Sequence, residues 1–221
     1  KLAEPGIVAE AFGAGGIYLP ALAGTADLSF NGPDNVSLSR IDAGGASGEL
    51  ALTRTGDVAS VTGNVTLPSL DARALVPMLG GASSTVTTAD SLWPEGPIDI
   101  GQGPRTTTGR IDVKVADVTG SGGTLLKDAS FGFDWDAQNI HLRNLNGQIG
   151  GGQLSLDATV CCSNAALPAQ PHSGRLALTG VALDAVTPPA IGESLAGTVT
   201  ASAECNGTGE TLAQARAAMT G

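Results

Sequence analysis

Charged side chains are scarce in this sequence, and so are aromatic ones. Asp, Glu, Lys and Arg make up only 14% of the 221 residues, and the aromatic residues are two Trp, one Tyr and four Phe. The 11 basic residues are scattered singly, and the formal net charge is −10. A chain without a basic patch lacks the electrostatic footprint that binds a phosphodiester backbone. We therefore expect no nucleic-acid partner.

Long apolar runs are also absent. No stretch of about eighteen consecutive apolar residues, the length that a membrane-spanning helix requires, occurs in the chain. The N-terminal segment, residues 1–21, lacks the basic start and cleavage site of a signal peptide, and its apolar residues are spaced for one short helix. The sequence is expected either to be soluble as it stands or to be a piece of a larger protein. Its ending just past a predicted helix favours the piece.

Residues that usually carry catalysis are few and isolated. His141 and His172 each stand alone at predicted turn or outward positions, so no Ser–His–Asp or Cys–His arrangement can be nominated. Asp134 and Asp136 flank Trp135, but alternation places both carboxylates on the solvent face of one strand with no third ligand nearby. We therefore expect no enzymatic activity, no metal site and no cofactor.

Three cysteines are too few for a disulfide framework. Cys161 and Cys162 are adjacent and Cys205 is distant, which also does not match the paired ligand spacings of a zinc site. One bridge from Cys205 to either neighbour is open if their strands pair, and unbridged thiols are the alternative.

The sequence is rich in segments in which apolar residues alternate with polar or small ones. Phe131, Phe133 and Trp135 alternate with small or acidic residues, and this period of two places one face of a strand inside and the other outside. The pattern breaks at residues 137–139 and resumes at Ile140, which predicts a hairpin. A third strand follows the next glycine run, so the unit is a β-meander.

Glycines punctuate this alternation and reveal an internal repeat. A glycine followed by apolar residues two and four positions later predicts a turn leading into a half-buried strand. The pattern begins at Gly24, Gly48, Gly63, Gly109, Gly152, Gly174 and Gly197. On a larger scale, residues 38–52 match residues 142–156 at an offset of 104, and residues 63–70 match residues 174–181 at an offset of 111. The second half therefore contains a connection seven residues longer.

The repeat divides the chain into two degenerate copies. The first, residues 22–90, includes a short predicted helix at residues 71–79. Residues 91–107 form a Pro- and Gly-rich link, and residues 108–221 form the second copy, with a terminal helix predicted at residues 211–219. We expect an all-β fold with one or two short helices, built on an extended, curved antiparallel sheet of about fifteen strands.

The alternation leaves two arrangements open, because both require one continuous aliphatic face. Two sheets can pack on each other as a β-sandwich, or one sheet can curl into a groove whose apolar lining meets lipid. If the groove forms, the alternation identifies its lining. These residues are Leu38, Leu50, Leu52, Val65 and Leu67 in the first copy and Leu142, Leu154, Leu156, Leu176 and Leu178 in the second.

Three segments carry a resemblance to a known family. Residues 22–79 form a run of strands leading into a short helix that contains Leu-Asp, and residues 92–99 read Leu-Trp-Pro-Glu-Gly-Pro-Ile-Asp. Residues 124–221 run through Leu-Arg-Asn-Leu-Asn-Gly to a closing Gly-Thr-Gly-Glu-Thr-Leu helix. In order and spacing, residues 22–221 resemble the C-terminal domain of bacterial AsmA-like proteins, including the Trp…Pro-Ile-Asp link between its two copies.

This resemblance implies a periplasmic protein whose strands form a lipid-lined β-groove, related in concept to TamB and the chorein-type bridge proteins. It implies phospholipid as the partner, carried between the inner and outer membranes, or a role in outer-membrane biogenesis. It also implies an inner-membrane anchor in a part of the protein that this chain does not include. The alternative is a structural or adhesive β-solenoid or β-sandwich module without lipid cargo. Connections of unequal length and isolated basic residues place that alternative second.

Overall fold

A computed structural model describes residues 24–32, 34–56, 58–72, 107–120, 123–161, 171–187 and 196–208. Several predictions concern residues outside these ranges. They are the N-terminal segment, the helix at residues 71–79 beyond Ala72, the link up to residue 106 and the terminal helix at residues 211–219.

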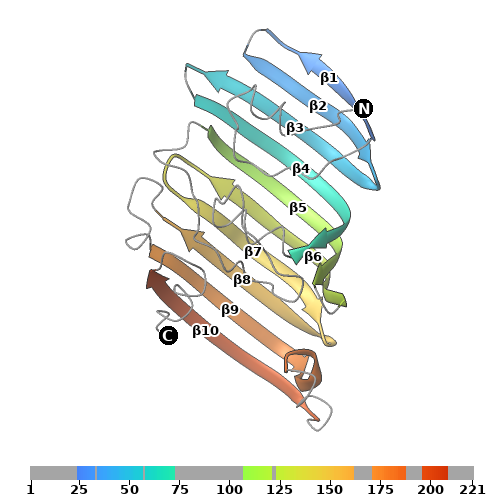
Figure 1. The fold of residues 1–221 in the computed structure, drawn as a ribbon, viewed down its shortest axis with the longest axis vertical. Coiled ribbons are helices and arrows are strands. Elements are labelled where there is room, and N and C mark those ends of the chain that lie inside the picture. Colours follow the sequence, from blue (N-terminus) through green and yellow to red (C-terminus); the bar gives the residue numbers. More distant parts are fainter. Residues whose placement is uncertain are drawn as a thin grey trace.

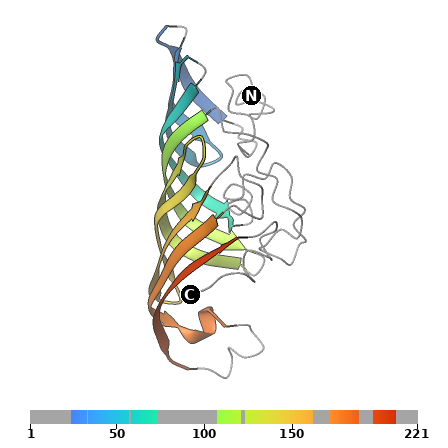
Figure 2. The ribbon, with the colours of Figure 1, turned by 90° about the vertical axis from the view of Figure 1, so that its left-hand side faces the viewer.

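The described residues form one ten-stranded sheet in which every strand lies beside its neighbours in sequence (Figure 1). The strands are β1 Gly24–Phe30, β2 Asn35–Ala43, β3 Ala46–Thr55, β4 Val58–Asp71, β5 Thr107–Gly120, β6 Gly123–Trp135, β7 Ile140–Ile149, β8 Gly152–Val160, β9 Pro171–Ala182 and β10 Thr198–Thr208. A 3₁₀ turn, Leu183–Ala185, follows β9. The sheet is open and curved in side view (Figure 2). The all-β prediction is confirmed, with ten strands rather than fifteen in the described part.

One pair of strands departs from the antiparallel prediction. β4 and β5 are parallel, from Ala59 opposite Thr107 to Asp71 opposite Thr119. A tight hairpin forces two strands to be antiparallel. Residues 72–106 separate β4 from β5, and this length of chain is sufficient to return to the end of the sheet at which β4 begins. The parallel pair lies where the sequence predicts the boundary between the two copies.

Cross-strand pairing aligns the side chains of one face in continuous rows. The first apolar row is Leu28, Leu38, Leu50, Gly63, Ile111, Phe133, Leu142, Ala158, Gly174 and Cys205. The second apolar row is Phe30, Val36, Leu52, Val61, Gly109, Trp135, Ile140, Val160, His172 and Gly207. Because each row crosses all ten strands, the sheet has one apolar face from edge to edge.

A shared β-bulge supports the two-copy interpretation. Arg40 in β2 and Asn144 in β7, which are 104 positions apart, both have φ of 50°. Each lies where pairing with the next strand skips, between Leu38 and Ile41 in the first copy and between Leu142 and Leu145 in the second. A left-handed residue at the same point of two strands is the structural counterpart of the sequence repeat.

The offset of 104 does not extend to the next strand. Leu38 lies opposite Leu50, whereas Leu142 lies opposite Ala158, so the counterpart of Leu50 is Ala158 rather than Leu154. The β7–β8 hairpin runs two residues further past the bulge on each strand than the β2–β3 hairpin does. A shift of four residues keeps every side chain on the same face, so alternation alone cannot detect it.

The best-buried part of the apolar face lies over β5, β6 and β7. Its buried residues are Val115, Val118, Leu126, Ala129, Phe131, Leu142 and Leu145, and Leu67 and Leu70 of β4 pack against them. Within this cluster, successive inward residues of β4, β5 and β6 are three positions apart instead of two. The reason is that Pro68, Ala116 and Asp128 have no partner residue in the strand pairing. Three neighbouring strands therefore bend together, which gathers these side chains into one cluster.

Candidate functional site

All ten predicted lining residues lie on the apolar face. Leu38 pairs with Leu50, Leu154 with Leu178 and Leu156 with Leu176 across adjacent strands. Leu142 is only 2% exposed and belongs to the buried cluster, so it contributes to the protein's own core. The other nine are half-buried, and three of them, Leu67, Leu154 and Leu156, pack against that cluster. A half-buried aliphatic side chain in a row of others still has apolar surface to cover.

The middle of the second apolar row is packed by an aromatic ring over a glycine. A Cβ added at Gly109 would come 2.1 Å from Cη2 of Trp135, so the indole covers the position where a side chain would stand. The indole Nε1 donates a hydrogen bond to Oγ1 of Thr107, 3.1 Å away. Trp135 is 6% exposed and Thr107 is 7% exposed, so solvent has little access to this part of the second apolar row.

The apolar face is most exposed at its β1 edge. Leu28 is 54% exposed and Phe30 is 65% exposed, and both belong to the apolar rows. At the opposite edge the inward residues of β10 are small, since Cys205 and Gly207 end the two rows. Large exposed side chains therefore stand at one end of the face and small ones at the other.

His172 is not an outward residue, contrary to the sequence-based prediction. It lies in the second apolar row between Val160 and Gly207. Its Nε2 atom is buried and has no hydrogen-bond partner. Burial lowers the pKa of His172 below its usual value, which favours the neutral imidazole. An uncharged histidine is compatible with an apolar face.

The bridge considered between Cys205 and one of the adjacent cysteines is not formed. Cys205 has a free thiol, which donates to the carbonyl oxygen of Gly174 at 3.6 Å, whereas Cys161 is disulfide-bonded. Cys205 pairs with Gly174 of β9, and β8 lies beyond β9. One intervening strand therefore separates Cys205 from Cys161.

The opposite face carries polar side chains in matching rows. One of these runs Ser29, Ser37, Ala51, Thr62, Arg110, Asp134, His141, Thr159, Ser173 and Asn206. Arg143 binds Asp134 with two nitrogens, the Nη2–Oδ1 distance being 2.9 Å, and this hydrogen bond raises the pKa of Arg143. His141 Nδ1 lies 3.0 Å from Oγ1 of Thr159. The outward prediction for His141 and Asp134 agrees with these positions.

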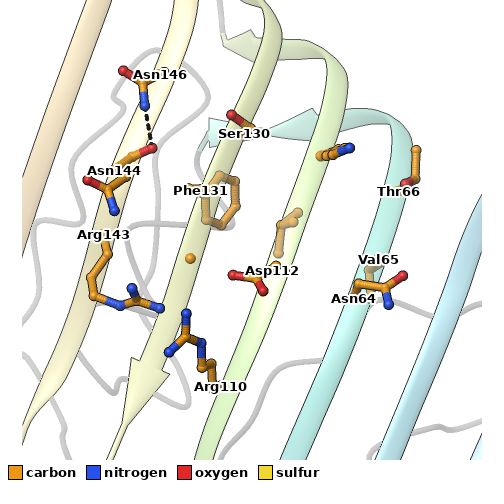
Figure 3. A pocket seen from close by; sticks show the side chains of 13 residues that line it. Asn64, Val65, Thr66, Arg110, Asp112, Ser130, Phe131, Arg143, Asn144 and Asn146 are labelled. Atoms are coloured by element: carbon orange, nitrogen blue, oxygen red, sulfur yellow. Dashed lines mark hydrogen bonds between the residues drawn. The ribbon is translucent and has the colours of Figure 1, made fainter.

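A shallow depression of about 410 Å³ lies on the polar face across β4 to β7. Figure 3 shows Arg110 and Arg143 extending over β6 from its two sides, with Asp112 beside them. Gly132 forms the floor, because a Cβ there would come 2.8 Å from Nη2 of Arg143. Lys114 completes the set of cations. Among the described residues, no histidine or cysteine lines the depression, so they offer charge and amide groups but no nucleophile paired with a base.

Neither a metal centre nor a membrane helix is found in the part of the chain that the structure describes. No group of three or more His, Cys, Asp or Glu side chains is placed to hold a metal ion there. Within the same residues, no helix has the length and apolar character needed to cross a membrane.

Comparison of the chain with protein-family models, curated proteins and solved structures found no match. The apolar face is therefore the candidate site on physical grounds alone. It is continuous over ten strands, and nine of its ten predicted lining residues keep exposed surface.

Proposed function

We propose that the apolar face of the sheet binds the acyl chains of phospholipids. The observation that carries this proposal is the continuity of the two apolar rows across all ten strands. Acyl chains need a dry surface without specific donors or acceptors. Between the edges, His172 is the only titratable residue of the two rows. It is half-buried, and burial lowers its pKa, which favours the neutral imidazole.

The energy available to such binding is substantial. Each buried methylene contributes about 0.8 kcal/mol, so an acyl chain that covers half-buried leucines along several strands gains several kcal/mol before ordering costs. Leu154, Leu156, Leu176 and Leu178 form a two-by-two block on β8 and β9. That block is the part of the face where we expect the chain to lie.

The cellular role that we propose follows from the resemblance to AsmA-like proteins. In that role the chain is a periplasmic section of a bridge that conducts phospholipid between the inner and outer membranes, or that affects outer-membrane assembly. Its attachment to the inner membrane would come from parts of the protein outside this chain. Support for this role is the order and spacing of the strands and of the Trp…Pro-Ile-Asp segment.

A pair of neighbouring residues tests lipid binding. Leu156 and Ser155 are both half-buried, but Leu156 pairs with Leu176 on the apolar face and Ser155 pairs with Ala177 and Asn146 on the polar face. A photo-crosslinking side chain at position 156, in cells or with phospholipid vesicles, should label phospholipid. The same group at position 155 should label solvent or nearby protein.

Two results would count against the proposal. Equal labelling of lipid from positions 155 and 156 would mean that the contact is not specific to the apolar face. Failure of position 156 to label lipid, together with consistent absence of phospholipid in mass spectra of gently purified protein, would favour a structural or adhesive module without lipid cargo.

A further inference from the structure

The sheet has two open edges. β1 and β10 are its terminal strands, and in the described part of the chain the outward backbone groups of both strands have no hydrogen-bond partner. Proteins usually protect such edges with lysine, proline or very short strands. Neither strand contains Lys or Pro, and β10 is 11 residues long. Each strand has one bulge, between Thr25 and Asp27 in β1 and between Val199 and Ala201 in β10, and pairing is regular at residues 27–30 and 201–208. Both edges are therefore able to pair with another strand.

The two edges are complementary in the size of their side chains. Phe30 begins the second apolar row and Gly207 ends it, while Leu28 begins the first row and Cys205 ends it. Within the sheet, the same combination of a ring over a glycine already occurs at Trp135 and Gly109. Phe30, which is 65% exposed, is the large residue that would cover Gly207 of another copy.

The strand directions agree with this match. Eight of the nine strand pairs are antiparallel and one is parallel, so β1 and β10 point the same way. Leu28 and Cys205 are separated by the same number of positions as Phe30 and Gly207, which is the condition for a parallel register. The β4–β5 pair shows that a parallel pair already occurs within this sheet.

We propose that β10 of one molecule pairs in parallel with β1 of a second copy of this chain. The register places Phe30 opposite Gly207 and Leu28 opposite Cys205, so both apolar rows continue across the junction. The contact is head-to-tail, because the two surfaces differ, and it leaves a free β1 and a free β10 at the ends. Each added copy extends the sheet by about 48 Å at a strand spacing of about 4.8 Å.

The same register brings two acidic residues together on the polar face. Asp27 would lie opposite Glu204, and like charges directly across two strands are unfavourable. Each is paired with an arginine on the next strand inward, Asp27 with Arg40 and Glu204 with Arg175. The arginines reduce the repulsion, and we expect Asp27→Asn to strengthen the association.

A disulfide tests the register directly. In a Leu28→Cys variant the new thiol should form a bond with the native Cys205 of another molecule under mild oxidation, since paired strands place Cα atoms within the 4.4–6.8 Å that a disulfide spans. β1 and β10 lie at opposite ends of the sheet, so the bond must join two molecules (Figure 1). A covalent dimer and longer species on a non-reducing gel, lost in Leu28→Cys/Cys205→Ser, are expected.

Ser29→Cys is the matched control. Ser29 lies one position along β1 and on the polar face, so its thiol would point away from Cys205. Equal crosslinking by Ser29→Cys and Leu28→Cys, or none by Leu28→Cys at any concentration, would overturn the proposed pairing. Neither result depends on lipid, so the outcome is independent of the function proposed above.

Sedimentation of the unmodified chain gives the second measurement. Average mass should rise with concentration and exceed that of two copies, because a head-to-tail contact leaves free ends. Phe30→Lys should weaken association by at least about tenfold, which corresponds to about 1.4 kcal/mol. Val58→Lys, which replaces a 48% exposed residue away from both edges, should not. Association that stops at a dimer, or equal effects of the two lysine variants, would contradict the proposal.

Discussion

Gly109 shows how much can depend on one missing side chain. A Cβ at this position would overlap the ring of Trp135, and the ring is also fixed by its hydrogen bond to Thr107. The sequence predicted both the strand that follows Gly109 and the inward position of Trp135. It did not predict their contact, because that contact depends on the pairing of β5 with β6.

We expect Gly109→Ala to destabilise the protein by about 1–3 kcal/mol, because the indole must move and lose its bond to Thr107. The measurement is urea unfolding, followed by Trp135 fluorescence in a Trp93→Phe background. Gly174→Ala is the control, since a Cβ there meets only ordinary contacts of 3.4 Å, to Asp157 and Cys205. If both substitutions lowered the free energy of unfolding equally, the contact with the indole would not be the cause of the destabilisation.

His172 and Cys205 mark the limit of residue-by-residue inference. Alternation along β9 places His172 on the face of Leu176 and Leu178, yet its polar type and its neighbours suggested a turn. The Cys205 bridge was left open because the order of strands was unknown. Strand order is a property of the whole sheet and is not contained in the local sequence pattern.

At the scale of single elements, the bulges determine which residues face inward. Asn144 has φ of 50°, and its N–H donates to Oδ1 of Asp157 at 2.8 Å. Leu142 and Leu145 are both inward although they are three positions apart. Without the extra residue, the rest of β7 would turn its apolar side chains to the polar face.

The positive φ of Asn144 limits which residues can replace it. Asn144→Gly should change the free energy of unfolding by less than about 0.5 kcal/mol, because glycine adopts a positive φ without strain. Asn144→Val should cost about 1–2 kcal/mol, because a β-branched residue is strained there. Urea unfolding would measure both, with Gln148→Val as the control at an exposed position of the same strand. Equal stability of Asn144→Val and Gln148→Val would contradict the role assigned to the bulge.

The elements themselves were the most predictable part of this protein. The hairpin from Phe131 through Ile140 and the strand after Gly152 occur where the alternation placed them. The register was less predictable: the counterpart of Leu50 is four residues from the predicted one. A pattern with a period of two is unchanged when the strand register shifts by an even number of residues. Only the positions of the turns, at Gly44–Gly45 and Gly150–Gly151, distinguish the two registers.

At the scale of the whole molecule, the described strands form one layer with an apolar and a polar face. A sheet face of this kind normally requires something apolar to cover it. The buried cluster over β5 to β7 accounts for the centre. Leu154 and Leu156 of β8 pack against that cluster, but they and the leucines of β9 remain half-buried. If acyl chains bind these leucines, ligand and fold should stabilise each other, because a ligand that binds only the folded state raises its stability.

A lysophospholipid added below its critical micelle concentration should raise the unfolding temperature of delipidated protein, by up to the equivalent of about 2.7 kcal/mol at a hundredfold excess over the dissociation constant. Leu156→Asp should abolish most of this gain, because the carboxylate would have to be desolvated against the acyl chain at a cost of several kcal/mol. Ser155→Asp should keep it, since Ser155 lies on the polar face. Circular dichroism without lipid would establish that both variants are folded. A lipid-induced gain that is equally large in both variants, or absent from the unmodified chain, would mean that the leucines of β8 and β9 are covered by the protein itself rather than by phospholipid.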